Sequence, residues 1–332
     1  MKQNKLNKVF SIVLFVTAIL GLIPLRVVAG DIRPAVEMEF RVYYDKNNLQ
    51  PFSFQMREAI LFLDANISEQ SSGLIEYVMR DNLVKGELER LYFIQRELPL
   101  NGQLTLGQFR SPFGYYDAFT VSHSLTKSVA VSPDGMLPAF KLRSLDIGLL
   151  WQSEFEQSAF ALAVVNGNGV TSLWDDNNFK DLIGHAQISF GGVQIGANGF
   201  YGRKNSLNTD GSVKTYSDVE VQAYGVEAMA FAGKAVVAGE ALLRKYGDVE
   251  SAGAYIMMNY DLDSYLHTLR SVTRIETFDP NRSIENDVQF QLAQGFRYTV
   301  NRGYTMKLEY ILNLERPKQQ FNSIFLELEY EL

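Results

Sequence analysis

Residues 287–332 read DVQFQLAQGFRYTVNRGYTMKLEYILNLERPKQQFNSIFLELEYEL, and the prediction of the fold starts from this stretch. Apolar and polar side chains alternate along residues 304–313 and again along residues 324–332, and residues 288–293 show the same pattern. A period of two residues places the two kinds of side chain on opposite faces of a β-strand. Three such strands joined by short polar connections predict an antiparallel meander. One apolar and one charged face favour a transmembrane β-barrel, while a soluble sandwich or lipocalin-type barrel would show the same alternation.

Short strand-like runs of this kind recur from Val36 to the last residue, and we expect about sixteen strands. After a first strand from Val36 to Tyr44, the predicted ranges are 53–67, 73–82, 85–96, 102–110, 143–152, 157–166, 181–190, 192–202, 219–232, 234–246, 251–262, 264–277, 286–299, 303–315 and 319–332. No run of helical period and no linker rich in Pro, Gly or Ser interrupts them. The sequence therefore predicts one all-β domain.

The predicted connections alternate between long and tight. Long polar connections at 111–142, 167–180, 203–218 and 278–285 follow odd-numbered strands. Tight connections at 68–72, 97–101, 153–156, Gly191, Gly233 and Asp263 follow even-numbered strands. An antiparallel up-and-down barrel that begins on the periplasmic side has short periplasmic turns and long outer loops. About sixteen strands would enclose a water-filled channel.

Residues 1–29 predict a cleaved signal peptide, which leaves residues 30–332 as the barrel domain. Lys2, Lys5 and Lys8 precede an uncharged, mostly apolar run from Val9 to Ile23, which is short for a membrane span. Val27-Val28-Ala29 has the small-residue spacing of a cleavage site. An uncleaved anchor helix is the alternative. The chain contains no cysteine, so neither a lipid-attachment cysteine nor a disulfide is expected.

The charge balance argues against nucleic acid as a partner. Four of the 31 basic residues lie in the predicted signal, so the mature part has 27 basic and 38 acidic residues, a net charge of −11. Nucleic-acid binding requires a basic surface. The three histidines, His123, His185 and His267, show neither metal-ligand spacing nor a Ser-His-acid pattern. We therefore expect no enzyme activity, no metal and no cofactor.

Several segments resemble the phosphate-selective porin O/P family of Gram-negative outer membranes. The segment GQFRSPFG at 107–114 is similar to the strand-to-loop motif of that family, and ALAVVNGNG at 161–169 is similar to a strand that ends in an Asn-Gly turn. NRGY at 301–304, KLEY at 307–310 and NSIFL at 322–326 resemble its closing hairpin. The resemblance is scattered over most of residues 36–332.

The resemblance implies a sixteen-stranded, usually trimeric porin whose long third outer loop, here Ser111 to Leu142, folds inward as a constriction. It also implies an outer-membrane location, with membrane lipid and small hydrophilic solutes or ions as partners. The phosphate-specific members line their pores with an arginine ladder and a lysine cluster. No such ladder can be identified in this acidic sequence, and the final residue is Leu332 rather than an aromatic residue.

Two sets of candidate site residues follow. Opposed charges at a constriction sort solutes by charge and size, and the candidates in the predicted loop and beside it are Tyr115, Tyr116, Lys127, Asp134, Lys141 and Arg143. Charges inside strands mostly mark the lumen, because a charge facing lipid is unfavourable by about 2–4 kcal/mol. The luminal candidates are Glu39, Arg41, Glu227, Glu240, Arg244, Arg270, Arg274, Lys307, Glu309, Glu327 and Glu329. Solvated loop charges and cross-wall ion pairs are the alternative interpretations.

The predicted strands at 85–96 and 264–277 do not alternate cleanly. In a regular strand, Glu87, Glu89 and Arg90 cannot all lie on one face, so the orientation of these two strands stays open. The sequence as a whole predicts a passive diffusion channel for small hydrophilic or ionic solutes, with phosphate or other anions as candidates. A structural or adhesive outer-membrane barrel without an open pore is the alternative.

Overall fold

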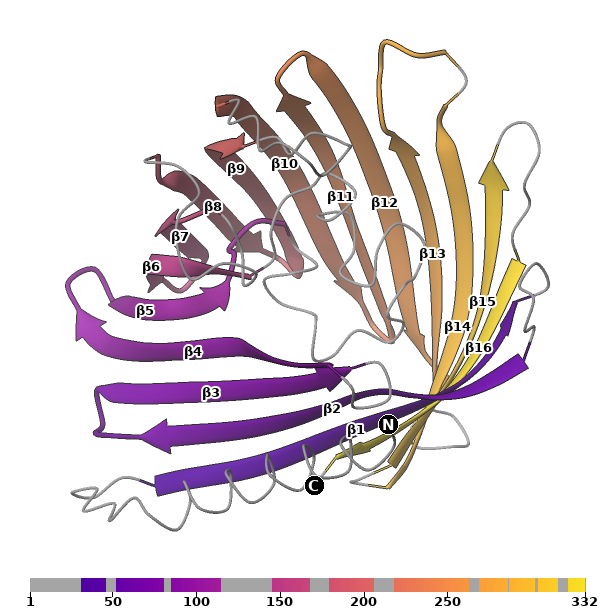
Figure 1. Cartoon of the computed structure of the whole chain (residues 1–332), viewed down its shortest axis with the longest axis horizontal. Helices are drawn as coiled ribbons and strands as arrows, with labels where there is room; N and C mark the ends of the chain where they lie inside the picture. Colours follow the sequence, from indigo (N-terminus) through magenta and orange to yellow (C-terminus); the bar gives the residue numbers. More distant parts are fainter. Residues whose placement is uncertain are drawn as a thin grey trace, which may run out of the picture.

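The computed structural model describes residues 31–45, 52–80, 85–114, 145–167, 179–205, 218–262, 269–285, 287–301, 304–315 and 322–331. Within these residues, sixteen antiparallel strands form a closed barrel in which neighbours in sequence pair and β1 pairs with β16 (Figure 1). The strands are β1 (Asp31–Asp45), β2 (Phe52–Asn66), β3 (Ser71–Arg80), β4 (Lys85–Leu98), β5 (Gly102–Arg110), β6 (Leu145–Glu154), β7 (Ser158–Val165), β8 (Asp181–Phe190), β9 (Val193–Asn205), β10 (Asp218–Ala232), β11 (Ala235–Tyr246), β12 (Val249–Asp261), β13 (Leu269–Asp279), β14 (Gln289–Asn301), β15 (Tyr304–Glu315) and β16 (Asn322–Glu331). The predicted antiparallel up-and-down barrel is confirmed.

One connection differs from the predicted pattern. The connection at 247–248 is short although it follows the odd-numbered β11. β12 ends at Asp261 and β13 begins at Leu269, and the tight join predicted at Asp263 lies outside the described residues. The tight turn predicted at Gly191 is present at Gly191–Gly192, with φ values of 55° and 82°. Two successive positive φ angles suit the primed turns that match the twist of a hairpin.

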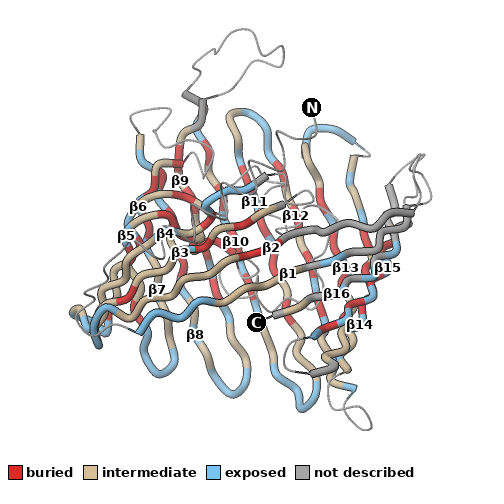
Figure 2. Tube along the Cα trace, turned by 60° about the horizontal axis from the view of Figure 1, so that its bottom comes forward, coloured by how far each residue is buried: buried red, intermediate tan, exposed pale blue. Residues whose placement is uncertain are grey.

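The two faces of the barrel wall differ in chemistry. Figure 2 shows buried residues in the middle of the strands and exposed residues at the turns. Exposed residues that alternate with buried ones are mostly large and apolar on the outer face, and examples are Leu149, Phe160, Leu162, Leu182, Ile188, Val226, Ile256, Phe296, Leu308 and Leu326. The inner face carries buried ionisable groups on β8, β10, β11, β13 and β15. No helix within the described ranges is long and apolar enough to cross a membrane.

A β-bulge explains the irregular alternation of β4. Its register with β3 shifts so that Glu76 pairs with Arg90 while Tyr77 pairs with Leu88, and Glu89 is left as the extra residue. Glu87 then lies opposite Val78, which is fully buried on the inner face. The inner face can therefore take Glu87, Glu89 and Arg90 together, which corrects the expectation for a regular strand.

Candidate pore

Residues 107–114, which we call the entry segment, separate from β4 after Gln108 and from β6 after Arg110. Gly107 has a φ of 124°, and a Cβ at this position would collide with the carbonyl oxygen of Leu91. β5 pairs with β4 only as far as Gln108. The Gln108 side-chain amide then donates to the carbonyl oxygens of Leu88 (2.6 Å) and Glu89 (2.7 Å). These bonds satisfy carbonyls of β4 while the chain turns away from that strand.

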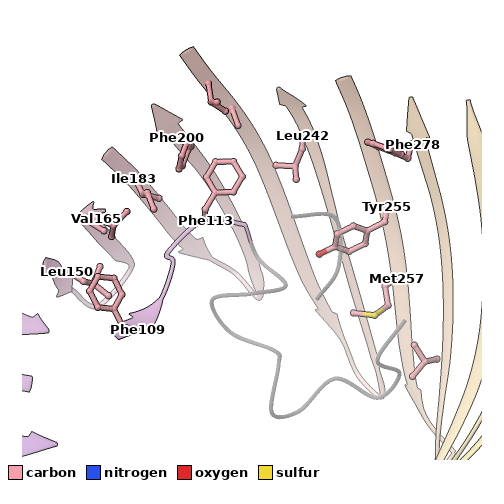
Figure 3. Packing of buried hydrophobic residues seen from close by; sticks show 14 residues of the cluster. Phe109, Phe113, Leu150, Val165, Ile183, Phe200, Leu242, Tyr255, Met257 and Phe278 are labelled. Carbon is pink, nitrogen blue, oxygen red and sulfur yellow. The ribbon is translucent and has the colours of Figure 1, made fainter. Parts of the chain in front are cut away.

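The entry segment ends inside the barrel. Ser111, Pro112, Phe113 and Gly114 are all buried. The Phe113 ring lies edge-on to that of Phe200 on β9, with centroids 6.4 Å apart (Figure 3). Gly114 lies beside β11, because a Cβ there would come within 2.8 Å of Glu240 Oε1. Since β9 and β11 are several strands away from β5, the start of the third outer loop folds into the lumen, as the predicted fold requires.

An apolar patch on the inner wall receives the entry segment. Phe109 and Phe113 belong to one cluster with buried side chains of β6 to β13, among them Leu150, Val165, Ile183, Phe200, Val221 and Leu242 (Figure 3). A fully buried Phe side chain contributes about 1.5–3 kcal/mol of hydrophobic stabilisation. The segment is therefore held against one side of the lumen by apolar contacts.

Three carboxylates lie in one line of register partners next to this patch. Glu227 pairs with Glu240, Glu240 with Tyr255, and Tyr255 with Glu276. We call Glu227, Glu240 and Glu276 the acidic row. Their exposed fractions are 4%, 6% and 2%. Arg274 forms an ion pair with Glu276, and its guanidinium carbon lies 4.8 Å from the centroid of the Tyr255 ring.

The first member of the acidic row reaches across β9. Glu227 Oε1 lies 2.7 Å from Nε2 of His185 on β8, and Asn198 Nδ2 donates to Glu227 Oε2 at 3.4 Å. Gly196 lies between the two strands, opposite Glu227 in register. A Cβ on Gly196 would come within 2.5 Å of Glu227 Oε1, so the absence of a side chain makes this contact possible.

A second line of register partners is mainly basic. Arg270 pairs with Arg297, Arg297 with Lys307, Lys307 with Glu327, and Glu327 with Arg41. We call Arg270, Arg297, Lys307 and Arg41 the basic row. Arg270 also forms an ion pair of 2.7 Å with Asp261, its partner on β12. Like charges placed directly opposite each other destabilise a sheet, so the fold maintains this row at some cost.

The basic row runs obliquely around the barrel wall. Barrel strands tilt by about 35–45°, so a line of register partners advances both around the barrel and along its axis. Arg270 is next to the first residue of β13, whereas Arg41 lies far from the start of β1. In the closed ring, β1 is seven strands from β10, so the strand that ends the basic row lies across the ring from the strand that begins the acidic row.

The structure places the predicted luminal residues as follows. Glu227, Glu240, Arg244, Arg274, Lys307 and Glu309 are buried, at alternating positions of their strands. Arg244 donates to Ser251 Oγ at 2.8 Å. Arg270 has a side chain that is 54% exposed. Glu39, Arg41, Glu327 and Glu329 have defined register positions, but their side chains lie outside the described part, as do the loop candidates Tyr115, Tyr116, Lys127, Asp134, Lys141 and Arg143.

Sequence reasoning missed four residues of this arrangement. Arg297 continues the inward alternation of Gln291, Ala293 and Gly295, so counting by two along β14 would have found it. Glu276 continues the alternation of β13 in the same way. His185 and Gln108 gave no signal, because their partners on β10 and β4 are distant in sequence.

Comparison with solved structures identifies the fold. The chain is similar to OmpT, an outer membrane protein of Vibrio cholerae, in its trimer form, with a TM-score of 0.67 and 11% identity over 92% of this chain and 100% of the other. It is similar to an anion-selective porin from Comamonas acidovorans, with a TM-score of 0.65 and 8% identity over 92% and 100% of the two chains.

OmpF of Salmonella typhi in complex with daunomycin gives a TM-score of 0.65 and 10% identity over 91% of this chain and 97% of the other. At these identities the likeness shows the porin-type fold alone. No protein-family model matches the chain, and no curated protein sequence matches it either.

Proposed function

We propose that this protein is a passive diffusion channel of an outer membrane, through which small hydrophilic or ionic solutes move down their gradients. The observation that carries the proposal is the contrast between the faces of a closed barrel: large apolar side chains outside and ionisable side chains inside. An apolar belt suits lipid, and a polar interior suits water-filled passage. A soluble barrel would have no reason to expose an apolar outer face.

We further propose that small anions, phosphate among them, are the preferred solutes. Two members of the basic row, Arg270 and Arg297, support this preference, because their side chains are at least partly exposed and can contact an anion. The whole-chain charge of −7 is a poor guide here, since many of the 38 acidic residues lie away from this line. The absence of enzyme activity remains a prediction.

Export through the predicted signal peptide, insertion into the outer membrane and assembly as a homotrimer complete the proposal. The supports are the N-terminal pattern, the apolar belt and the family resemblance. Mass determination of the processed protein would test the first of these, because cleavage after Ala29 leaves Gly30 at the new terminus.

Planar lipid bilayers provide the test of the channel. Purified, folded protein should give stepwise increases in conductance, and the reversal potential in a potassium chloride gradient should indicate preference for chloride. Added phosphate should reduce the chloride current if it binds the same row. Folded protein that inserts without any conductance would exclude the channel.

A barrel without an open pore, with a structural or adhesive role, is the second candidate. The buried apolar cluster inside the lumen favours it, because side chains such as Phe113 occupy space that a wide channel would leave to water. The same bilayer recording separates the two candidates, since only the channel conducts.

A further inference from the structure

We propose that the entry segment covers the acidic side of the lumen and thereby determines the sign of ion selectivity. The inference rests on the proposed channel and assigns a selectivity role to Phe113, Gly114 and Gln108. When the entry segment is packed on the wall, permeating ions meet the exposed members of the basic row, Arg270 and Arg297. When it is displaced, they also meet the carboxylate of Glu240.

Gly114 lies against the Glu240 carboxylate. Gly114 has a φ of 81°, and any Cβ there would be within 2.8 Å of the Glu240 carboxylate. Glu240 faces the lumen, yet its exposed fraction is only 6%. The neighbouring Glu227 is similarly buried and contacts His185 and Asn198. Ions in the lumen therefore cannot reach direct contact with these two carboxylates.

Two arginines of the basic row are more exposed than Glu227 and Glu240. The Arg270 side chain is 54% exposed and Arg297 is partly exposed, whereas Lys307 is 8% exposed. The Coulomb interaction falls with distance, and salt screens it over about 8 Å at physiological ionic strength. Charges that ions can approach directly therefore influence permeation more than charges beneath the entry segment.

Gln108 is the residue that turns the chain inward. Gln108 satisfies the carbonyls of Leu88 and Glu89 at the point where β5 leaves β4. Without the Gln108 amide, these two carbonyl groups of β4 would lack its hydrogen bonds, and backbone N–H groups of the entry segment could bind them instead. Gln108 is thus a positioning residue: it touches no solute, and it acts through the placement of Phe113 and Gly114.

The experiment is a double-mutant cycle read as the ratio of anion to cation permeability. Phe113→Ala removes the ring that packs on Phe200. We expect higher conductance and a fall in the anion-to-cation permeability ratio of about threefold or more, because ions can then approach the Glu240 carboxylate directly. Glu240→Gln alone should change the ratio little, whereas Glu240→Gln added to Phe113→Ala should restore most of the loss. Gln108→Leu should act in the same direction as Phe113→Ala.

Phe160→Ala is the matched control, because it removes the same ring from a side chain that is 49% exposed on the outer face and should leave the ratio unchanged. The proposal is overturned if Glu240→Gln shifts the ratio equally in both backgrounds, since the carboxylate would then be uncovered already. It is also overturned if Phe113→Ala and Gln108→Leu both leave the ratio unchanged. A wild-type protein that does not conduct would instead refute the channel itself.

Discussion

At the scale of the residue, Gly196 is the position where a single methyl group has the clearest consequence. Its Cβ would lie 2.5 Å from Glu227 Oε1, so Gly196→Ala should displace that carboxylate from His185. Loss of partners by buried polar groups should lower the free energy of unfolding by about 1–3 kcal/mol. Denaturant titration in detergent micelles would measure it. Gly199→Ala on the same strand is the control, because nothing lies within 4 Å of its Cβ position, and equal effects of the two variants would contradict this account.

At the scale of the element, the β4 bulge determines which face each residue of the strand occupies. Deleting Leu88 removes the extra residue but places Glu89 opposite Tyr77, at the position from which Leu88 faces outward, so that a carboxylate would face lipid. We expect a smaller fraction of folded barrel, measured by refolding into detergent. Glu89→Gln keeps the strand length and a side chain of the same size, and it should therefore fold like wild type. Efficient folding of the deletion variant would contradict this assignment of faces.

The same strands show how far sequence could predict structure. In a strand without a bulge, such as β15, each residue pairs with one residue on each flanking strand, and alternation alone assigns the faces. Lys307 and Glu309 lie inside, as alternation requires. It fails in β4, because the bulge depends on pairing with β3 and leaves no local signal. The entry segment could be predicted only through the family resemblance. Its contacts with Phe200 and Glu240 involve strands that are distant in sequence, so local sequence carries no signal for them.

At the scale of the whole molecule, closure between β1 and β16 leaves the barrel without free sheet edges. Unpaired backbone groups are unfavourable in lipid, so a chain truncated before Asn322 should not form a stable barrel. The full chain should migrate faster on a gel when unboiled than when boiled, whereas the truncated chain should migrate identically in both states. Glu331→Gln, which keeps every strand, serves as the control. A compact, heat-sensitive form of the truncated chain would argue against closure as the source of stability.

Closure also has a kinetic consequence. Glu37 lies opposite Glu331, so one of the pairings that complete the barrel joins residues from almost opposite ends of the polypeptide. Contacts of such long sequence separation form slowly, because much chain entropy must be lost before they stabilise anything. Until β16 pairs with β1, one edge of β1 stays unpaired, because β2 covers only the other edge. The unfolded chain must therefore be protected from aggregation until β16 pairs with β1.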